Sequence, residues 1–170
     1  MISLILFLLA LVIGIIIVVL GAWITFKWED NECLPDALRT GIELVNRSKH
    51  SVNMVTDLSP ECFENKLFLS IVQDAVGNGV HFNILYESEK GLEKLHKFKR
   101  LVQESDNKIV ARQLTIKPPY HFWVADSNHV RIEKPHPKGD VKKVEAYLRF
   151  NTLTLGVRYQ KIFSALWRKK

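Results

Sequence analysis

The chain has 170 residues, a mean hydropathy of -0.00 and a formal net charge of +6. Its first 26 residues contain no charged side chain and 22 of them are apolar, so all 24 basic and 18 acidic residues lie in the other 144. This division excludes a single soluble globule, a protein with several membrane spans and a disordered chain.

Residues 2–26 predict one transmembrane helix. At about 1.5 Å per residue this segment extends roughly 37 Å, enough to cross a hydrocarbon core of roughly 30 Å. A cleaved signal peptide is the alternative, with Ala22 as a small residue at the cleavage site, but the basic n-region of such a peptide is missing. Basic residues follow the span and none precede it, which predicts a single-pass protein with a cytoplasmic C-terminal domain.

Three segments follow from these patterns. Residues 1–26 are expected to be the transmembrane anchor, 27–34 a juxtamembrane linker and 35–170 one domain, long enough to bury a core. Cys33 and Cys62 are too few for a disulfide scaffold, and free thiols agree with a reducing compartment.

Apolar spacing predicts the helices of this domain. The first begins at Pro35 and buries Leu38, Ile42 and Val45. The second opens at Ser59 and Pro60 and ends at Gly77. Its expected inner stripe is Phe63, Leu67, Ile71 and Ala75. A third helix is expected over 91–104, with Leu92, Leu95, Phe98 and Val102 facing inward, and a last one over 151–167.

Strands are expected between these helices. They are predicted at 51–58, 80–86, 108–116, 120–126 and 129–133. Helices alternate with strands in the first half, and several strands follow one another in the second. This order predicts an α/β domain built around a mixed sheet.

The stretch from Asp74 to Tyr86 joins a helix to a strand through Gly77-Asn78-Gly79-Val80 and resembles the phospholipase D superfamily. Phe150-Asn151 and Phe163-Ser164-Ala165-Leu166-Trp167 are similar to the last strand and helix of that family's half-domain. The resemblance extends from Pro35 to the chain end. It implies a phospholipase D-like mixed sheet flanked by helices, behind the transmembrane helix.

The diagnostic motif of that family is His-x-Lys-x4-Asp, in which the His attacks phosphorus and the Lys holds the phosphate. When Asp126 is aligned with the motif Asp, Pro119 occupies the His position and His121 the Lys position. Glu133-Lys134 stands where the family usually has Gly-Ser. The motif is degenerate, so the usual phosphohistidine route is not expected.

Alternation along the strands nevertheless predicts a polar pocket where His121, Arg131, Glu133 and His136 converge. The candidate catalytic residues are His121, His136 and Asp126, and the candidate ligand-binding residues are Arg131, Glu133 and Lys134. In the alternative interpretation, Arg131 and Glu133 pair with each other and His121 is a buried structural histidine. The His and Cys spacings predict no metal site, and no cofactor motif is present.

A basic stripe follows the third helix. Lys90, Lys94, Lys97 and Arg100 recur at helical spacing and predict a membrane-surface patch for anionic lipid, at about 1 kcal/mol per basic residue. Nucleic acid is attracted by the same charge but is the less favoured partner. A solvated helix face without a partner is the alternative.

Two functions follow. The first is a non-catalytic, membrane-anchored domain that binds anionic lipid, a phosphate-containing ligand or a partner protein. The second is a divergent phosphodiesterase, a phospholipase or nuclease, with an active site at a dimer interface. Both include a homodimer, because half-domains of this fold leave an edge or a site face uncovered.

Overall fold

The computed structural model describes residues 11–17, 29–31, 34–87, 91–133 and 146–169. Residues 11–17 are helical, and six large apolar side chains there are exposed. The remainder of the expected transmembrane helix, residues 1–10 and 18–26, lies outside the described residues. Within the described part of the chain, no helix is both long enough and apolar enough to cross a bilayer.

The described strands form one seven-stranded mixed sheet in the order β1-β7-β6-β5-β2-β3-β4. β2, β3 and β4 are parallel, and the other pairings are antiparallel. The strand bounds are β1 Glu29–Asn31, β2 Ser51–Thr56, β3 His81–Tyr86, β4 Ile109–Gln113, β5 His121–Ala125, β6 His129–Glu133 and β7 Ala146–Arg149.

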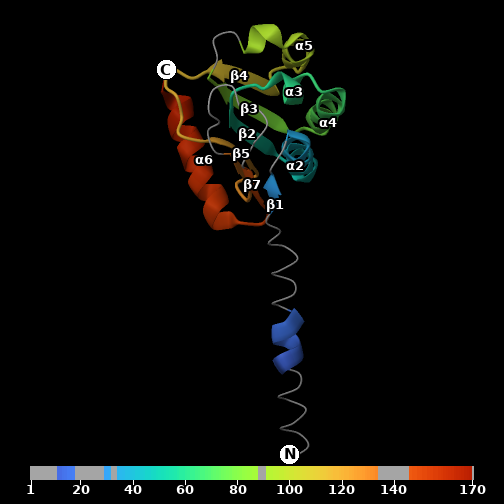
Figure 1. The fold of residues 1–170 in the computed structure, drawn as a ribbon, viewed down its shortest axis with the longest axis vertical. Helices are drawn as coiled ribbons and strands as arrows, with labels where there is room; N and C mark the ends of the chain where they lie inside the picture. Colours follow the sequence, from blue (N-terminus) through green and yellow to red (C-terminus); the bar gives the residue numbers. More distant parts are fainter. Residues whose placement is uncertain (1–10, 18–28, 32–33, 88–90, 134–145, 170) are drawn as a thin grey trace, which may run out of the picture.

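Helices cover the two faces of this sheet unequally (Figure 1). α2 (Leu34–Arg47), α3 (Pro60–Phe63), α4 (Lys66–Gly77) and α5 (His96–Glu104), with the 3-10 turn η1 (Leu92–Lys94), lie on one face, called here the four-helix face. On the other, α6 (Leu153–Arg168) packs against β2, β5 and β6. We call this the α6 face.

Each face has its own apolar core, because side chains alternate along a strand. On β2, Val52 and Met54 join the cluster under α2, α4 and α5, whereas Val55 joins the cluster under α6. Phe63, Phe68 and Trp123 form edge-on and tilted aromatic contacts in the larger core, with centroids 5.5 to 6.2 Å apart. The strand pattern thus supports a two-faced sheet, as the sequence predicts.

The turn between β5 and β6 fixes α6 and the start of β2. Asp126 has φ +51° there, and its carboxylate accepts hydrogen bonds from the backbone N–H groups of Lys49, His50 and Ser51 at 2.7, 3.0 and 2.8 Å. Gly156 of α6 lies so close that a Cβ would be 1.9 Å from the carbonyl oxygen of Ser127. Only glycine fits this approach.

The prediction of a single second helix with Leu67 in its inner stripe is wrong. The side chain of Asn65 accepts hydrogen bonds from the N–H groups of Leu67 and Phe68 and starts a new helix, α4. The break changes the helical phase, so Leu67 is 60% exposed. The buried residues of α4 are Phe68, Val72 and Val76.

Other boundaries differ by a few residues. The strands predicted at 51–58 and 108–116 end earlier, at Thr56 and Gln113, and Asp126 belongs to a turn and not to β5. The resemblance implied a last strand at Phe150-Asn151, whereas β7 ends just before these residues, at Arg149, and three residues of the expected linker form β1, which pairs with β7. α2, β3, β6, α5 and α6 lie where the sequence places a helix or a strand.

Candidate functional site

The strand ends nearest the family's motif carry a cluster of charged side chains on the four-helix face. β5 and β6 pair so that His121 is opposite Glu133 and Trp123 is opposite Arg131. The end of β3 contributes Glu87 from the same edge, because β5 runs antiparallel to β2 and β2 runs parallel to β3. We call Glu87, His121, Arg131 and Glu133 the edge cluster.

The side chain of Arg131 contacts Glu133, Thr40 and Trp123. Its Nη1 is 2.6 Å from Oε2 of Glu133, and its Nε donates to Oγ1 of Thr40 at 3.4 Å. The guanidinium also lies 5.4 Å from the centroid of the Trp123 ring. Arg131 is only 3% exposed, so this cation is almost fully removed from water and already paired.

Thr40 connects α2 to the edge cluster. It lies one helical turn after Asp36, and its hydroxyl is within hydrogen-bonding distance of the carbonyl oxygens of Asp36 and Ala37 at 3.0 and 3.1 Å. A hydroxyl that donates to the helix backbone presents its lone pair to Arg131. The helix therefore orients the guanidinium from above the sheet.

His121 bridges two carboxylates. Its Nε2 is 2.8 Å from Oε1 of Glu87, a hydrogen bond, whereas its Nδ1 is 3.8 Å from Oε1 of Glu133, which is an ion-pair distance. Burial lowers the pKa of His121, but Glu133 and Glu87 outweigh that effect and the pKa is raised overall. The cationic form of this histidine is therefore favoured.

Glu133 remains ionised in this setting. Burial alone would raise its pKa, but His121 and Arg131 together hold the pKa well below the usual range of a glutamate. Cys62 of α3 is nearby, and burial raises the pKa of its thiol to about 12. The thiol is therefore neutral and unreactive at ordinary pH. Two carboxylates and two cations balance one another in the edge cluster.

The structure thus brings together His121, Arg131 and Glu133, three of the residues singled out from the sequence. Asp126 lies at the other end of β5, roughly 17 Å away at about 3.3 Å per residue, and supports the backbone of β2. His136 and Lys134 lie outside the described residues.

Sequence reasoning missed Glu87, Thr40 and Cys62. Glu87 directly follows a predicted strand, which places it at the carboxyl edge of the sheet, and this position is the one signal that could have found it. Thr40 and Cys62 give no such signal, because they reach the cluster through the packing of α2 and α3.

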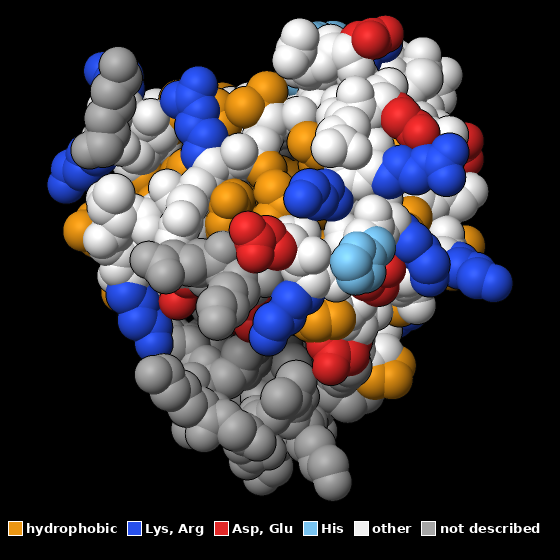
Figure 2. Space-filling view, turned by 90° about the horizontal axis from the view of Figure 1, so that it is seen from above, with side chains coloured by type: hydrophobic (Ala, Val, Ile, Leu, Met, Phe, Trp, Pro, Cys, Tyr) orange, Lys and Arg blue, Asp and Glu red, His pale blue; other side chains and the backbone are white. Residues whose placement is uncertain are grey.

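The described residues of the basic stripe lie on η1 and α5. Lys94, Lys97 and Arg100 are exposed there, and Lys90 lies outside the described residues. Lys97 is 3.9 Å from Glu64, and Arg100 forms an ion pair with Glu104 at 2.7 Å. Figure 2 shows basic and acidic side chains interspersed over the end of the molecule seen from above, with apolar side chains in a hollow between them.

Across the described residues, no group of three His, Cys, Asp or Glu side chains could hold a metal ion. The hydrogen bond of His121 with Glu87 and the ion pairs of Glu133 make the edge cluster a network of hydrogen-bonded and ion-paired groups. Its chemical capacity is that of a carboxylate–histidine pair beside a neutralised arginine.

No family profile matches this chain, and no curated protein matches it in sequence. Solved structures do resemble it. One is TrmBL2, described as an archaeal chromatin protein with a novel mode of DNA binding, at a TM-score of 0.66 and 14% identity. The match covers 96% of this chain and 62% of that one, so the chain spans less than two thirds of TrmBL2.

A second similar structure is Nuc from Salmonella typhimurium, described as a phospholipase D family member. It superposes with a TM-score of 0.61 at 15% identity, over 84% of this chain and 96% of Nuc. At such low identity the likeness concerns the fold alone. Together with the mixed sheet flanked by helices, it gives this chain a phospholipase D-like fold.

Proposed function

We propose that this chain is a membrane-anchored binding protein whose phospholipase D-like domain does not use phosphohistidine chemistry. The proposal rests on the ion pair between Arg131 and Glu133. The two side chains are 2.6 Å apart, and Arg131 is only 3% exposed. A phosphate group would have to displace this carboxylate before it reached the cation, and a broken buried pair costs about 3–5 kcal/mol.

The residues at the motif positions support the same conclusion. Pro119, at the position of the nucleophile, has no side-chain atom that can attack phosphorus, and His121, at the position of the lysine, is hydrogen bonded to Glu87. The edge cluster is formally balanced when His121 is protonated. It therefore serves to hold β3, β5, β6 and α2 together and has no free positive charge for a ligand.

The anchor is proposed from the sequence of residues 2–26, which contain no charge. The basic residues after the expected span support a cytoplasmic orientation of the domain. β1 begins at Glu29, three residues after Phe26, so the expected span can end at most about 10 Å from this edge of the sheet.

The proposed partner is an anionic lipid surface, contacted by the exposed basic residues Lys94, Lys97, Lys99 and Arg100 of η1 and α5. These residues lie near β4, six strand spacings from β1, or roughly 29 Å at about 4.8 Å per spacing. They reach the bilayer that holds the anchor only when the domain lies on its side. Lipid contact thus implies a defined orientation of the domain.

The orientation can be tested by hydrogen exchange on the full chain reconstituted in nanodiscs. Exchange in the peptide 92–104 should slow in nanodiscs containing anionic lipid, compared with zwitterionic ones, and high salt should remove the difference. Lys94→Glu combined with Lys99→Glu should abolish it. Lys161→Glu on α6 is the control and should leave it intact. Equal exchange in both lipids would exclude the lipid partner.

A divergent phosphodiesterase is the second candidate, and one observation favours it. His121 Nε2 is hydrogen bonded to Glu87 while its Nδ1 has no hydrogen-bond partner among the described residues, as in a carboxylate-supported base or nucleophile. The full chain in detergent should not hydrolyse bis(p-nitrophenyl) phosphate above the rate of buffer. Hydrolysis that disappears in both His121→Asn and His136→Asn would overturn the non-catalytic proposal.

A homodimer belongs to both candidates. β4 is an edge strand of the described sheet and can pair with a second copy or pack against one. Light scattering of the full chain in detergent, corrected for the micelle, should give twice the mass of 19.6 kDa at micromolar concentration. A single-chain mass at all concentrations would exclude the dimer.

A further inference from the structure

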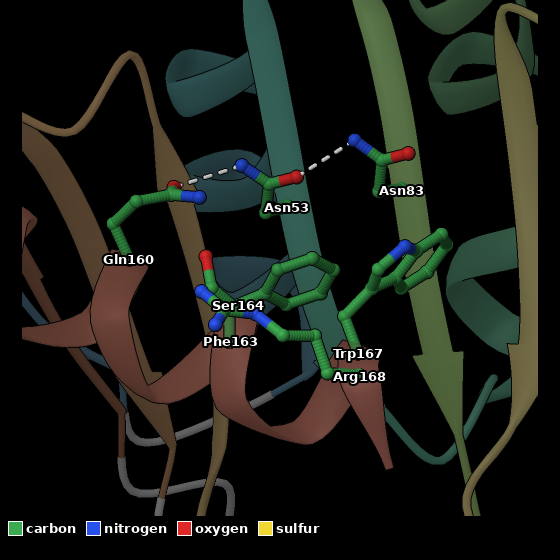
Figure 3. A pocket seen from close by; sticks show the side chains of 7 residues that line it. All are labelled: Asn53, Asn83, Gln160, Phe163, Ser164, Trp167 and Arg168. Carbon is green, nitrogen blue, oxygen red and sulfur yellow. Dashed lines mark hydrogen bonds between the residues drawn. The ribbon is translucent and has the colours of Figure 1, made fainter. Parts of the chain in front are cut away.

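A hollow lies on the α6 face, on the opposite side of the sheet from the edge cluster. It has a volume of about 270 Å³, just below the roughly 300–1,000 Å³ typical of small-ligand sites, and so suits a small ligand. Side chains of α6 form one wall, and Asn53 of β2 and Asn83 of β3 form the floor (Figure 3). We call this hollow the α6 cleft.

The floor of the α6 cleft is a chain of three amides. Asn83 Nδ2 donates to Asn53 Oδ1 at 2.9 Å, and Asn53 Nδ2 donates to Gln160 Oε1 at 2.8 Å, as Figure 3 shows. Asn53 is 4% exposed and lies between the apolar residues Val52 and Met54. A buried amide is unfavourable unless it is hydrogen bonded, so this chain of bonds holds the floor in one arrangement.

The chain of amides ends in a donor. Gln160 uses its oxygen for Asn53, so its NH₂ group is available, and it has no hydrogen-bond partner within the described part of the chain. Asn83 is similarly left with its oxygen at the other end. Gln160 therefore presents hydrogen-bond donors to the cleft.

Two further donors follow at helical spacing. Gln160, Ser164 and Arg168 are four residues apart on α6 and all line the cleft. In Figure 3 the side chain of Arg168 extends back along α6 toward Ser164, so a hydroxyl and a guanidinium gather beside the amide. Three donor groups that converge on one volume suit the three oxygens of a phosphate.

Charge and apolar surface favour the same class of ligand. No acidic side chain lines the cleft in the described part of the chain. Phe163 and Trp167 complete the wall, with ring centroids 5.4 Å apart, and Arg112 lies 4.1 Å from the centroid of the Trp167 ring. A positive, partly aromatic wall suits an anion with an apolar part.

We propose that the α6 cleft binds a small phosphate monoester, whose phosphate is held by Gln160, Ser164 and Arg168 and whose apolar part lies against Phe163 and Trp167. This site is separate from the edge cluster, and its existence does not depend on the lipid partner proposed above. The structure gives it a preformed floor and, among the described residues, an arginine without an acidic partner, which the edge cluster lacks.

Calorimetric titration of the full chain in detergent with phenyl phosphate tests the site. Saturable binding is expected, and inorganic phosphate, which lacks the apolar part, should bind at least about tenfold more weakly. Arg168→Gln should weaken phenyl phosphate binding about tenfold or more, since it removes a charge-assisted hydrogen bond. Lys161→Gln removes the same charge from an exposed position of α6 that does not line the cleft, and it should have no such effect.

Gln160→Glu is the most discriminating variant. A glutamate keeps an oxygen for Asn53 Nδ2, so the floor and the fold are retained, but it replaces the NH₂ donor with negative charge. Phenyl phosphate binding should be lost while thermal unfolding is unchanged. The proposal is wrong if phenyl phosphate does not bind, if Gln160→Glu binds it normally, or if Lys161→Gln and Arg168→Gln weaken it equally.

Discussion

The two faces of the sheet treat buried polar side chains differently. On the four-helix face, Arg131 is paired with Glu133 and covered by α2, so the polar groups satisfy one another. On the α6 face, one helix packs on the described strands, and the amide chain of Asn53 ends at a hollow. Whether a buried polar residue can bind a ligand therefore depends on how completely helices cover it.

The residues that the sequence singled out and the proposed ligand site also lie on different faces of the sheet. The edge cluster includes His121, which the sequence alignment puts at the lysine position of the motif, and the cations of the cluster are paired with carboxylates. The cleft on the opposite face has no counterpart in that motif. The residues that the sequence singled out form a paired cluster on one face of the sheet, and the ligand site proposed here lies on the other face.

The largest expected effect on stability comes from breaking the buried ion pair of the edge cluster. Glu133→Ala leaves the guanidinium of Arg131 buried without its carboxylate and should lower the free energy of unfolding by about 3–5 kcal/mol. Denaturant unfolding of the full chain in detergent, followed by tryptophan fluorescence, measures this change. The double variant Arg131→Met with Glu133→Leu should recover most of the loss, because no charge remains buried. A loss below about 1 kcal/mol in the single variant would mean that the pair is effectively solvated.

The docking of α6 is tested by Gly156→Ala. The added Cβ would lie 1.9 Å from the carbonyl oxygen of Ser127, so α6 must shift, and we expect the free energy of unfolding to fall by about 1–3 kcal/mol. Gly77→Ala, at the end of α4, is a matched control because nothing lies within 4 Å of its Cβ. That variant should be neutral or stabilising by up to about 1 kcal/mol. Equal effects at the two glycines would contradict the tight contact between α6 and the turn.

Asp126 shows whether a candidate catalytic residue has a structural role instead. Asp126→Ala removes the acceptor of three backbone N–H groups and should lower the free energy of unfolding by about 1–2 kcal/mol. Asp126→Asn keeps one acceptor oxygen, which can still serve His50 and Ser51, and should lose less. If thermal unfolding shows no difference between the wild type and Asp126→Ala, the carboxylate does not support β2.

The sequence predicted much of this architecture because local patterns dominate it. The short apolar runs of β2 and β3 and the apolar stripe of α2 reflect local burial, which the sequence shows directly. Asn65 changed the phase of α4 through a capping bond that apolar spacing does not show. β7 has four residues, too few for a clear period of two.

The site was less predictable, for a physical reason. His121, Arg131 and Glu133 are placed by alternation on two neighbouring strands, so their meeting follows from the sequence. Their partners Glu87 and Thr40 are 34 and 91 residues away from His121 and Arg131, and only tertiary packing brings them close. The amide chain likewise joins Asn53 to Gln160 across 107 residues.

The smallest expected effect is a pH dependence of the free energy of unfolding, which distinguishes the environment of His121 from that of His129. The folded-state pKa of His121 is raised above 6.5, so its contribution to stability is complete below pH 6.5 and is lost as the pH rises through the folded pKa. Burial lowers the pKa of His129, beside the β5–β6 turn, so its contribution is lost as the pH falls through 6.5. The free energy of unfolding should therefore decrease on both sides of a maximum near pH 6.5. His121→Asn should flatten the alkaline side and His129→Asn the acidic side, as measured by denaturant unfolding across this range. An alkaline side unchanged in His121→Asn would show that Glu87 and Glu133 do not stabilise the cationic histidine, and the charge balance inferred for the edge cluster would then be wrong.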